Sequence, residues 1–167
     1  MKLYLIRHGI AHNLYEEDIT LDSQRKLTSQ GKNQLKTIGT GLNRLKIQPD
    51  IICSSPLVRA KQTAEILAHT INFPKEIHTI ASLAPGHSYS DLYKDLKSLL
   101  PFESVFLVGH EPCLGLLASH LLWTSDELKI DVKKASIIRI DIFDIPPTMP
   151  GVLKWIVTPK FFENILG

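Results

Sequence analysis

Short apolar runs alternate along this chain with longer segments in which apolar residues recur every three or four positions, and this alternation restricts the fold more than any other feature. The clearest runs lie in residues 3–6, 51–53 and 104–108. Buried strands separated by amphipathic helices pack as a largely parallel sheet with helices on its faces. The sequence therefore predicts an α/β fold with three layers, α/β/α, a mostly parallel central sheet and an antiparallel edge strand, in one domain over residues 1–167.

The individual strands and helices are predicted from the spacing of apolar residues and from the turn residues between them. We expect strands at residues 2–7, 50–53, 77–80, 104–108, 136–143 and 152–157. We expect helices capped by Thr28 or Ser29, by Ser55 with Pro56 in the first helical position, and by Ser90, and a further helix around Leu114 to Leu121. The proline-rich segment 146–151 makes the last two strands an antiparallel edge hairpin, and the tail 159–167 gives no pattern. Gly39 and Gly41 each weaken the first helix by about 1 kcal/mol relative to alanine, so we expect close packing on the sheet to require them.

Polar residues stand where three of these strands end. Arg7, His8 and Gly9 follow the first strand, Arg59 follows the second, and His110 follows the fourth. Because the carboxyl ends of parallel strands meet at one edge of a sheet, where ligands bind, we expect these side chains to share one pocket. Gly9 would let a ligand approach the backbone closely.

These residue types suit phosphoryl transfer. Arg59 falls in the first turn of a helix whose free N–H groups favour an anion, and two planar guanidinium groups fit a phosphate better than a monocarboxylate. A neutral imidazole at His8 can attack phosphorus in line and carry the phosphoryl group as a phosphohistidine. Arg7, Arg59 and a protonated His110 would hold the non-bridging oxygens. We therefore expect the environments of the two histidines to separate their pKa values, and we expect no metal or other cofactor, because the arginines supply the positive charge.

The segment Leu5-Ile6-Arg7-His8-Gly9 resembles the signature of the histidine phosphatase superfamily, which includes the cofactor-dependent phosphoglycerate mutases. Later motifs match in order: Leu27-Thr28-x-x-Gly31, Ser54-Ser55-Pro56-x-x-Arg59-Ala60-x-Gln62-Thr63-Ala64 and Val108-Gly109-His110. Residues 7–11, 22–28 and 109–112 resemble the short SixA branch. The resemblance implies a phosphoglycerate mutase-like fold, with His8 as the nucleophile, Arg7, Arg59 and His110 as the phosphate pocket and Arg25 as a flanking residue.

The same resemblance bears on the substrate. The name-giving member of the SixA branch is a phosphohistidine phosphatase that acts on a histidine-phosphotransfer domain of a sensor kinase. The resemblance implies that this chain is a phosphohistidine phosphatase whose partner is a phosphohistidine-bearing protein such as a histidine-phosphotransfer domain. A small-metabolite phosphomonoester phosphatase or mutase of the same superfamily, acting on a small phosphorylated metabolite, and a non-catalytic phosphate-binding module stay open as alternatives.

One departure from the superfamily concerns the proton donor. The loop that often carries the proton-donating carboxylate, Ser82–Ser88, contains no Asp or Glu here. A phosphate monoester needs its alkoxide leaving group protonated, whereas the imidazole of a phosphohistidine leaves more easily. The absence therefore favours a phosphohistidine substrate. Possible substitute donors are His87 in this loop and, in the acidic loop after the first strand, Glu16, Glu17, Asp18 and Asp22.

Composition argues against several other classes. The formal net charge is +2 and the lysines and arginines are scattered, unlike the basic stripe of a nucleic-acid binder. No apolar run reaches the length of a membrane span, and Arg7 and His8 interrupt the apolar stretch that a signal peptide would need. Cys53 and Cys113 give no disulfide framework and no metal-binding spacing, so we expect reduced thiols in a cytoplasmic protein.

Overall fold

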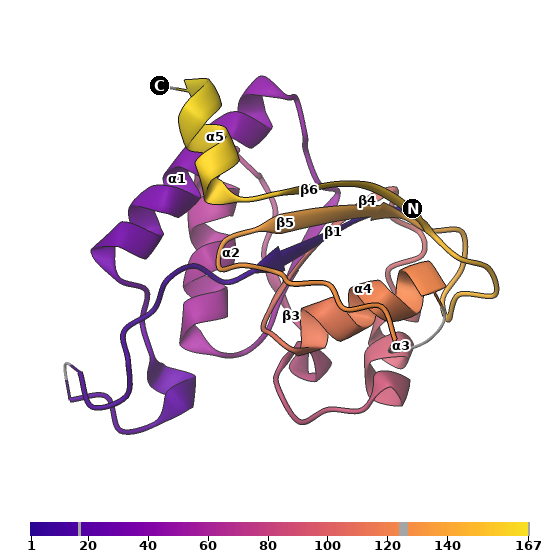
Figure 1. Cartoon of the computed structure of the whole chain (residues 1–167), viewed down its shortest axis with the longest axis horizontal. Coiled ribbons are helices and arrows are strands. Elements are labelled where there is room, and N and C mark those ends of the chain that lie inside the picture. The colour runs from indigo at the N-terminus through magenta and orange to yellow at the C-terminus, as the bar shows by residue number, and fades with distance from the viewer. Residues whose placement is uncertain (17, 124–126, 167) are drawn as a thin grey trace.

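The computed structural model describes residues 1–16, 18–123 and 127–166, and a six-stranded sheet forms its centre (Figure 1). The strands are β1 (Lys2–Arg7), β2 (Ile51–Ser54), β3 (His78–Thr79), β4 (Ser104–Gly109), β5 (Ile137–Asp141) and β6 (Val152–Val157), in the spatial order β3-β2-β4-β1-β5-β6. Strands β3, β2, β4 and β1 are parallel, and β5 pairs antiparallel with both β1 and β6. The mostly parallel sheet with an antiparallel hairpin at one edge is confirmed, and the reversed strand is the second from that edge.

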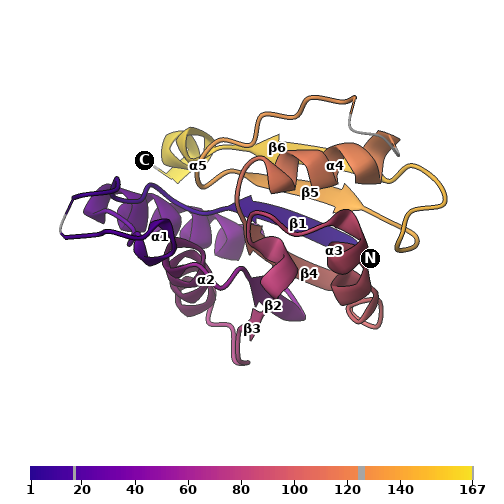
Figure 2. The same ribbon diagram turned by 90° about the horizontal axis from the view of Figure 1, so that it is seen from below.

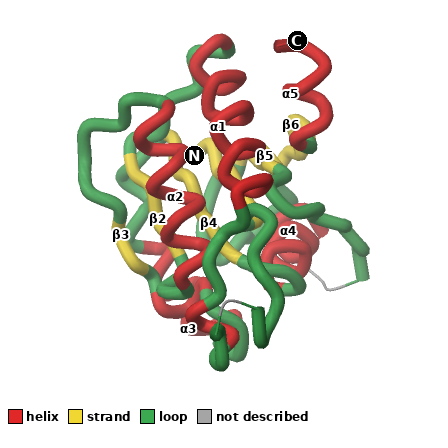
Figure 3. Tube along the Cα trace, turned by 90° about the vertical axis from the view of Figure 1, so that its left-hand side faces the viewer, coloured by secondary structure: helices red, strands yellow, loops and turns green. Residues whose placement is uncertain are grey.

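The helices cover both faces of this sheet. They are α1 (Ser29–Arg44), α2 (Val58–Thr70), α3 (Tyr89–Lys97), α4 (Cys113–Trp123) and α5 (Pro159–Leu166), with short 3-10 helices at Asp22–Gln24 and Ala81–Leu83. Helices α1, α2 and α5 lie on one face and α3 and α4 on the other, which gives the predicted three layers (Figures 2 and 3). Within the described part of the chain, every helix is too short or too polar to cross a lipid bilayer.

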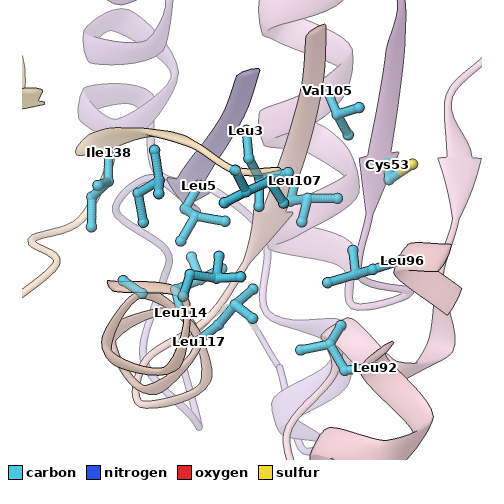
Figure 4. Packing of buried hydrophobic residues seen from close by; sticks show 14 of the residues in the cluster. Leu3, Leu5, Cys53, Leu92, Leu96, Val105, Leu107, Leu114, Leu117 and Ile138 are labelled. Carbon is cyan, nitrogen blue, oxygen red and sulfur yellow. The ribbon is translucent and has the colours of Figure 1, made fainter. Parts of the chain in front are cut away.

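The alternation of side chains along the central strands divides the core between the two faces. On β1, Leu3 and Leu5 point toward α3 and α4, whereas Tyr4 and Ile6 point toward α1 and α2. Figure 4 shows the first of these layers, in which leucines from β1 and β4 pack against leucines of α4 and α3. Because strands buried on both faces cannot alternate with polar residues, they appear in the sequence as continuous apolar runs. Cys53 belongs to this core, and burial raises the pKa of its thiol to about 12.

Two of the predicted helix caps are wrong. Helix α2 begins at Val58, with Leu57 as an N-cap that makes no side-chain hydrogen bond. The Ser55 hydroxyl instead accepts a hydrogen bond from the Leu57 amide at 3.3 Å, and it also contacts a histidine of the site described below. Ser88 rather than Ser90 caps α3, since its hydroxyl accepts from the Asp91 amide. The expected cap of α1 is confirmed: the Thr28 hydroxyl accepts from the Gly31 amide.

The chain's tail forms a helix that the sequence pattern did not predict. Helix α5 begins at Pro159, a residue that suits the first helical position, and buries Phe162 against α1. That contact explains Gly41, where an added Cβ atom would lie 2.1 Å from the Phe162 ring, while Gly39 faces Thr70 of α2. Both glycines therefore serve packing between helices, and the predicted packing on the sheet is wrong.

Replacing Gly41 by alanine is expected to destabilise the fold. The new methyl group displaces Phe162, and overpacking of this kind costs more than the helix propensity of about 1 kcal/mol that alanine gains. We expect the free energy of unfolding in urea to fall by about 1–2 kcal/mol. The matched control is Thr40→Ala on the exposed face of the same helix, which should stay within about 0.5 kcal/mol of the wild type. Equal stability of the Gly41→Ala and Thr40→Ala proteins would contradict this packing.

Candidate active site

The site lies where β1 and β4 end side by side. Arg7 closes β1 and pairs in register with Gly109, the last residue of β4, so the residues that follow, His8 and His110, emerge together. Their rings lie 5.0 Å apart between centroids. Arg59 lies in the first turn of α2, the helix that follows β2, and its Nε is 3.2 Å from His8 Nε2. The structure thus brings together residues that are far apart in the sequence.

His8 is buried and fixed at both ring nitrogens. Its Nδ1 lies 2.7 Å from the Gly9 carbonyl oxygen, so Nδ1 carries the proton and donates, and Nε2 keeps its lone pair, which accepts from Arg59 Nε. Burial lowers the pKa of His8 to about 4; the Gly9 carbonyl opposes this shift, and the charges of Arg59 and Arg7 add to it. His8 is therefore a neutral imidazole near pH 7, with an unprotonated electron pair at Nε2.

His110 is buried beside it and hydrogen-bonded to a serine. Its Nε2 lies 2.8 Å from Ser55 Oγ, and its Nδ1 is buried without a hydrogen bond within the described residues. Burial, followed by the charges of His8 and Arg59, lowers the pKa of His110 to about 3. The expected separation, with a cationic His110 beside a neutral His8, is therefore wrong for the free protein. Both rings are buried beside the same arginines, which disfavours a proton on either ring. The negative charge of a bound phosphate would act in the opposite direction and raise both pKa values.

Asp22 joins two arginines at the rim of the site. Its Oδ2 accepts from Arg59 at 2.9 Å, its Oδ1 accepts from Arg25 at 2.9 Å, and its carbonyl oxygen accepts a second bond from Arg59 at 2.7 Å. Burial alone would raise the pKa of Asp22, but hydrogen bonds from Arg25 and Arg59 hold it below its ordinary value. An ionised carboxylate has no proton to give, so this geometry argues against Asp22 as the proton donor. Arg25 thus shares Asp22 with Arg59, and the role that the resemblance implies for it, flanking the phosphate, stays a prediction.

Arg7 is held on the opposite side by the loop before β5. Its guanidinium donates to the Val132 carbonyl oxygen at 2.7 Å, while its Nε is buried without a partner among the described residues. The neighbouring Glu111 is half-buried; burial raises the pKa of its carboxyl group, and Arg7 and the backbone amides of Gly115 and Val132 oppose that rise. Glu111 therefore supports the loop to which Arg7 binds.

Lys134 is a cation of the site that the sequence analysis missed. The Ala135 amide donates to the carbonyl oxygens of Arg7 and His8 at 3.1 Å each, which places Lys134 beside them. Burial lowers the pKa of Lys134, and Arg7, Arg25 and Arg59 lower it further. The signal was available: a strand antiparallel to β1 begins where β1 ends, so the residues before β5 belong to this edge.

Gly9 has a packing role in this arrangement. Its amide donates to Thr63 Oγ1 at 3.1 Å, and an added Cβ atom would lie 3.0 Å from Leu35 Cδ1 and 3.3 Å from Leu27 Cδ2. Its missing side chain therefore faces α1 and the core. A contact between Gly9 and a ligand stays a prediction.

The other candidate proton donors that the structure describes have partners or surroundings other than the two histidines. The Glu16 carboxylate accepts hydrogen bonds from the backbone and side chain of Asn13, and Asp18 is exposed at a left-handed turn. His87 is exposed and lines a different pocket, together with Cys113. Within the described residues, none of these three side chains makes a hydrogen bond or ion pair with Arg7, His8, Arg59 or His110. Glu17 lies outside the residues that the structure describes.

The protonation of the two histidines can be measured directly. We expect ¹⁵N resonances of the His8 and His110 rings to keep the neutral form down to about pH 5, because their pKa values lie near 4 and 3, whereas an ordinary histidine gains its proton near 6.5. Spectra of His8→Asn and His110→Asn proteins assign the signals. Protonation of either ring near pH 6.5 would contradict the burial argued above.

Comparison with known proteins identifies relatives of this chain. The model of the histidine phosphatase superfamily (branch 1) matches residues 3–84. An uncharacterized protein of Picosynechococcus sp. is 36% identical over 142 residues, which make up 84% of this chain and 84% of that protein. The phosphohistidine phosphatase SixA of Escherichia coli is 28% identical over 123 residues, which make up 72% of this chain and 74% of that protein.

A solved structure extends the likeness to the whole fold. The protein histidine phosphatase SixA complexed with tungstate superposes with a TM-score of 0.84 at 24% identity, over 96% of this chain and 99% of that one. This likeness confirms the predicted α/β/α fold.

Proposed function

Because this chain belongs to the histidine phosphatase superfamily and is a phosphatase, we propose that it hydrolyses protein phosphohistidine through a covalent phosphohistidine on His8. The observation that carries the proposal is the state of His8. Its Nε2 keeps an unprotonated electron pair, because Nδ1 donates to the Gly9 carbonyl oxygen, and Arg59 stands 3.2 Å from that nitrogen. A nucleophile beside a fixed cation is what attack on a phosphoryl group requires.

The reaction proceeds in two displacements. His8 Nε2 attacks phosphorus, a P–N bond forms to His8, and the P–N bond to the substrate imidazole breaks. Arg7, Arg59 and His110 hold the non-bridging oxygens while charge spreads over them. Water then attacks the phosphorus, the bond to Nε2 breaks, and inorganic phosphate leaves as His8 recovers its electron pair.

The choice of phosphohistidine rests on the leaving group. A substrate imidazole protonated at its other nitrogen leaves as a neutral ring and needs no proton from the protein. An alkoxide does need one. Asp22, the carboxylate that binds Arg59, is ionised and paired with Arg25 and Arg59, and the Glu111 carboxyl group accepts from the backbone amides of Gly115 and Val132. The relationship to SixA of Escherichia coli, a phosphohistidine phosphatase, supports the same choice.

Two peptides that differ in one phosphorylated residue test this substrate. A phosphohistidine peptide should exceed the matching phosphoserine peptide in kcat/KM by about 10²-fold or more, the usual contribution of a general acid. The His8→Asn protein measures the spontaneous loss of phosphate. Equal or faster turnover of phosphoserine would overturn the choice and favour a phosphomonoester phosphatase. Binding of phosphate without turnover of either peptide would favour a phosphate-binding module.

A further inference from the structure

A second pocket adjoins the catalytic residues and shares Arg7 with them. It encloses about 520 Å³ between the end of β1, the start of α1, the loop before β5 and the amino end of α5. These segments gather at one end of the sheet (Figure 1). A volume of this size accommodates a small ligand or several atoms of a peptide.

The charge of this pocket is unbalanced. Its ionisable lining residues are four cations and two acids: Arg7, Lys133, Lys134, Lys160, Asp131 and Glu163. Among the residues that the structure describes, none of the three lysines has a carboxylate within ion-pair distance. Positive charge gathered without internal partners attracts an anion from solution.

The charges that line the pocket act on the proposed nucleophile, His8. The charge of Lys134 acts on His8, and those of Arg7, Arg25 and Arg59 act on Lys134. Because Arg7 lines this pocket, a phosphoryl group held between Arg7 and Arg59 would lie beside it. The rest of the substrate has room to extend toward Lys133 and Lys160.

We propose that the pocket beside Arg7 binds a second anionic group, a carboxylate or phosphate, carried by the leaving-group side of the substrate. The inference rests on the proposed function and narrows its substrate class. The anion has two possible sources: an acidic side chain near the phosphohistidine of a protein, or the anionic part of a phosphorylated metabolite. The lysine ammonium groups recognise both by the same charge-assisted hydrogen bonds.

The first experiment compares two phosphohistidine peptides, one with flanking aspartates and one with asparagines at the same places. We expect the wild type to prefer the acidic peptide about tenfold, mainly through KM, because the lysines form charge-assisted hydrogen bonds with its carboxylates. In the double variant Lys133→Gln/Lys160→Gln, the ratio of kcat/KM for the acidic peptide to that for the asparagine peptide should fall toward one. The matched control, Lys97→Gln/Lys154→Gln, removes two exposed lysines elsewhere and should keep the preference.

The second experiment needs no turnover. Calorimetry compares ω-phosphonocarboxylates of increasing chain length with alkylphosphonates of equal length. We expect one chain length to bind about tenfold tighter than its alkyl counterpart, and the Lys133→Gln/Lys160→Gln protein to lose that gain.

The two experiments identify the source of the anion and separate the two proposals. A preference in the peptides alone indicates a protein substrate, and one in the phosphonates alone indicates a metabolite. No preference for an anion in either experiment overturns the pocket assignment, even if phosphohistidine is hydrolysed. Failure to hydrolyse phosphohistidine, with the phosphonate preference intact, overturns the proposed function alone.

Discussion

Replacing His8 by asparagine is expected to lower kcat by about 10⁴-fold or more, because the substitution removes the nitrogen that attacks phosphorus. Asparagine keeps a polar group of similar size in the buried position, so we expect the variant to keep the wild-type fold. The same substitution should abolish labelling of the protein by a substrate that carries radioactive phosphate. The label is trapped by quenching in alkaline detergent, since acid cleaves the P–N bond.

The matched control is His69→Asn, the same chemical change at an exposed position on α2. It should label and turn over like the wild type, and thermal melting should show that both variants are folded. A His8→Asn protein that still acquires the label would place the covalent intermediate on another residue. Normal turnover without any label in the wild type would instead indicate direct attack by water.

The common edge of the site could be predicted from the sequence, because any parallel sheet sends the residues after its strands to one edge. That Arg7 and His110 meet depends on β4 lying beside β1, and the sequence pattern does not give this strand order. The apolar runs located those strands because burial on both faces excludes polar residues. Helix starts were less predictable. Ser55 binds His110 and leaves Leu57 as the N-cap of α2, and for α3 the two serines Ser88 and Ser90 are equally suitable by residue type.

The electrostatics of the site depend on contacts that periodicity does not encode. The bridge from Asp22 to Arg25 and Arg59 is made by the short 3-10 helix Asp22–Gln24, which hydrophobic periodicity does not predict. The same holds for Lys134, whose place depends on the Ala135 amide binding the end of β1. The sequence analysis expected His110 to be cationic from the chemistry of the bound state. In the free protein, burial is the larger influence on both histidines, and the charges of Arg7 and Arg59 add to it.

Arg59 combines three of these contacts, and its replacement by lysine is the second large effect we expect. Its Nε donates to His8 while its terminal nitrogens bind the carboxylate and the carbonyl oxygen of Asp22. A lysine keeps the charge but cannot direct three donors in one plane. We expect Arg59→Lys to lower kcat/KM by about 10²- to 10³-fold, as the loss of an aligned donor to the transition state does in other enzymes. Labelling of His8 should still occur, but more slowly.

A variant at the partner residue distinguishes charge from geometry. In Asp22→Asn, the guanidinium of Arg59 keeps its planar form and its contact with His8, but loses the ion pair that fixes its outer edge. If the alignment of the guanidinium group determines kcat/KM, Asp22→Asn should lower kcat/KM strongly in the wild type. It should change kcat/KM little in the Arg59→Lys protein, in which the aligned donors are already lost. Arg44→Lys, on the exposed end of α1, is the control for the chemical change alone. Additive losses in the double variant, or wild-type activity of Arg59→Lys, would show that only the positive charge at this position matters.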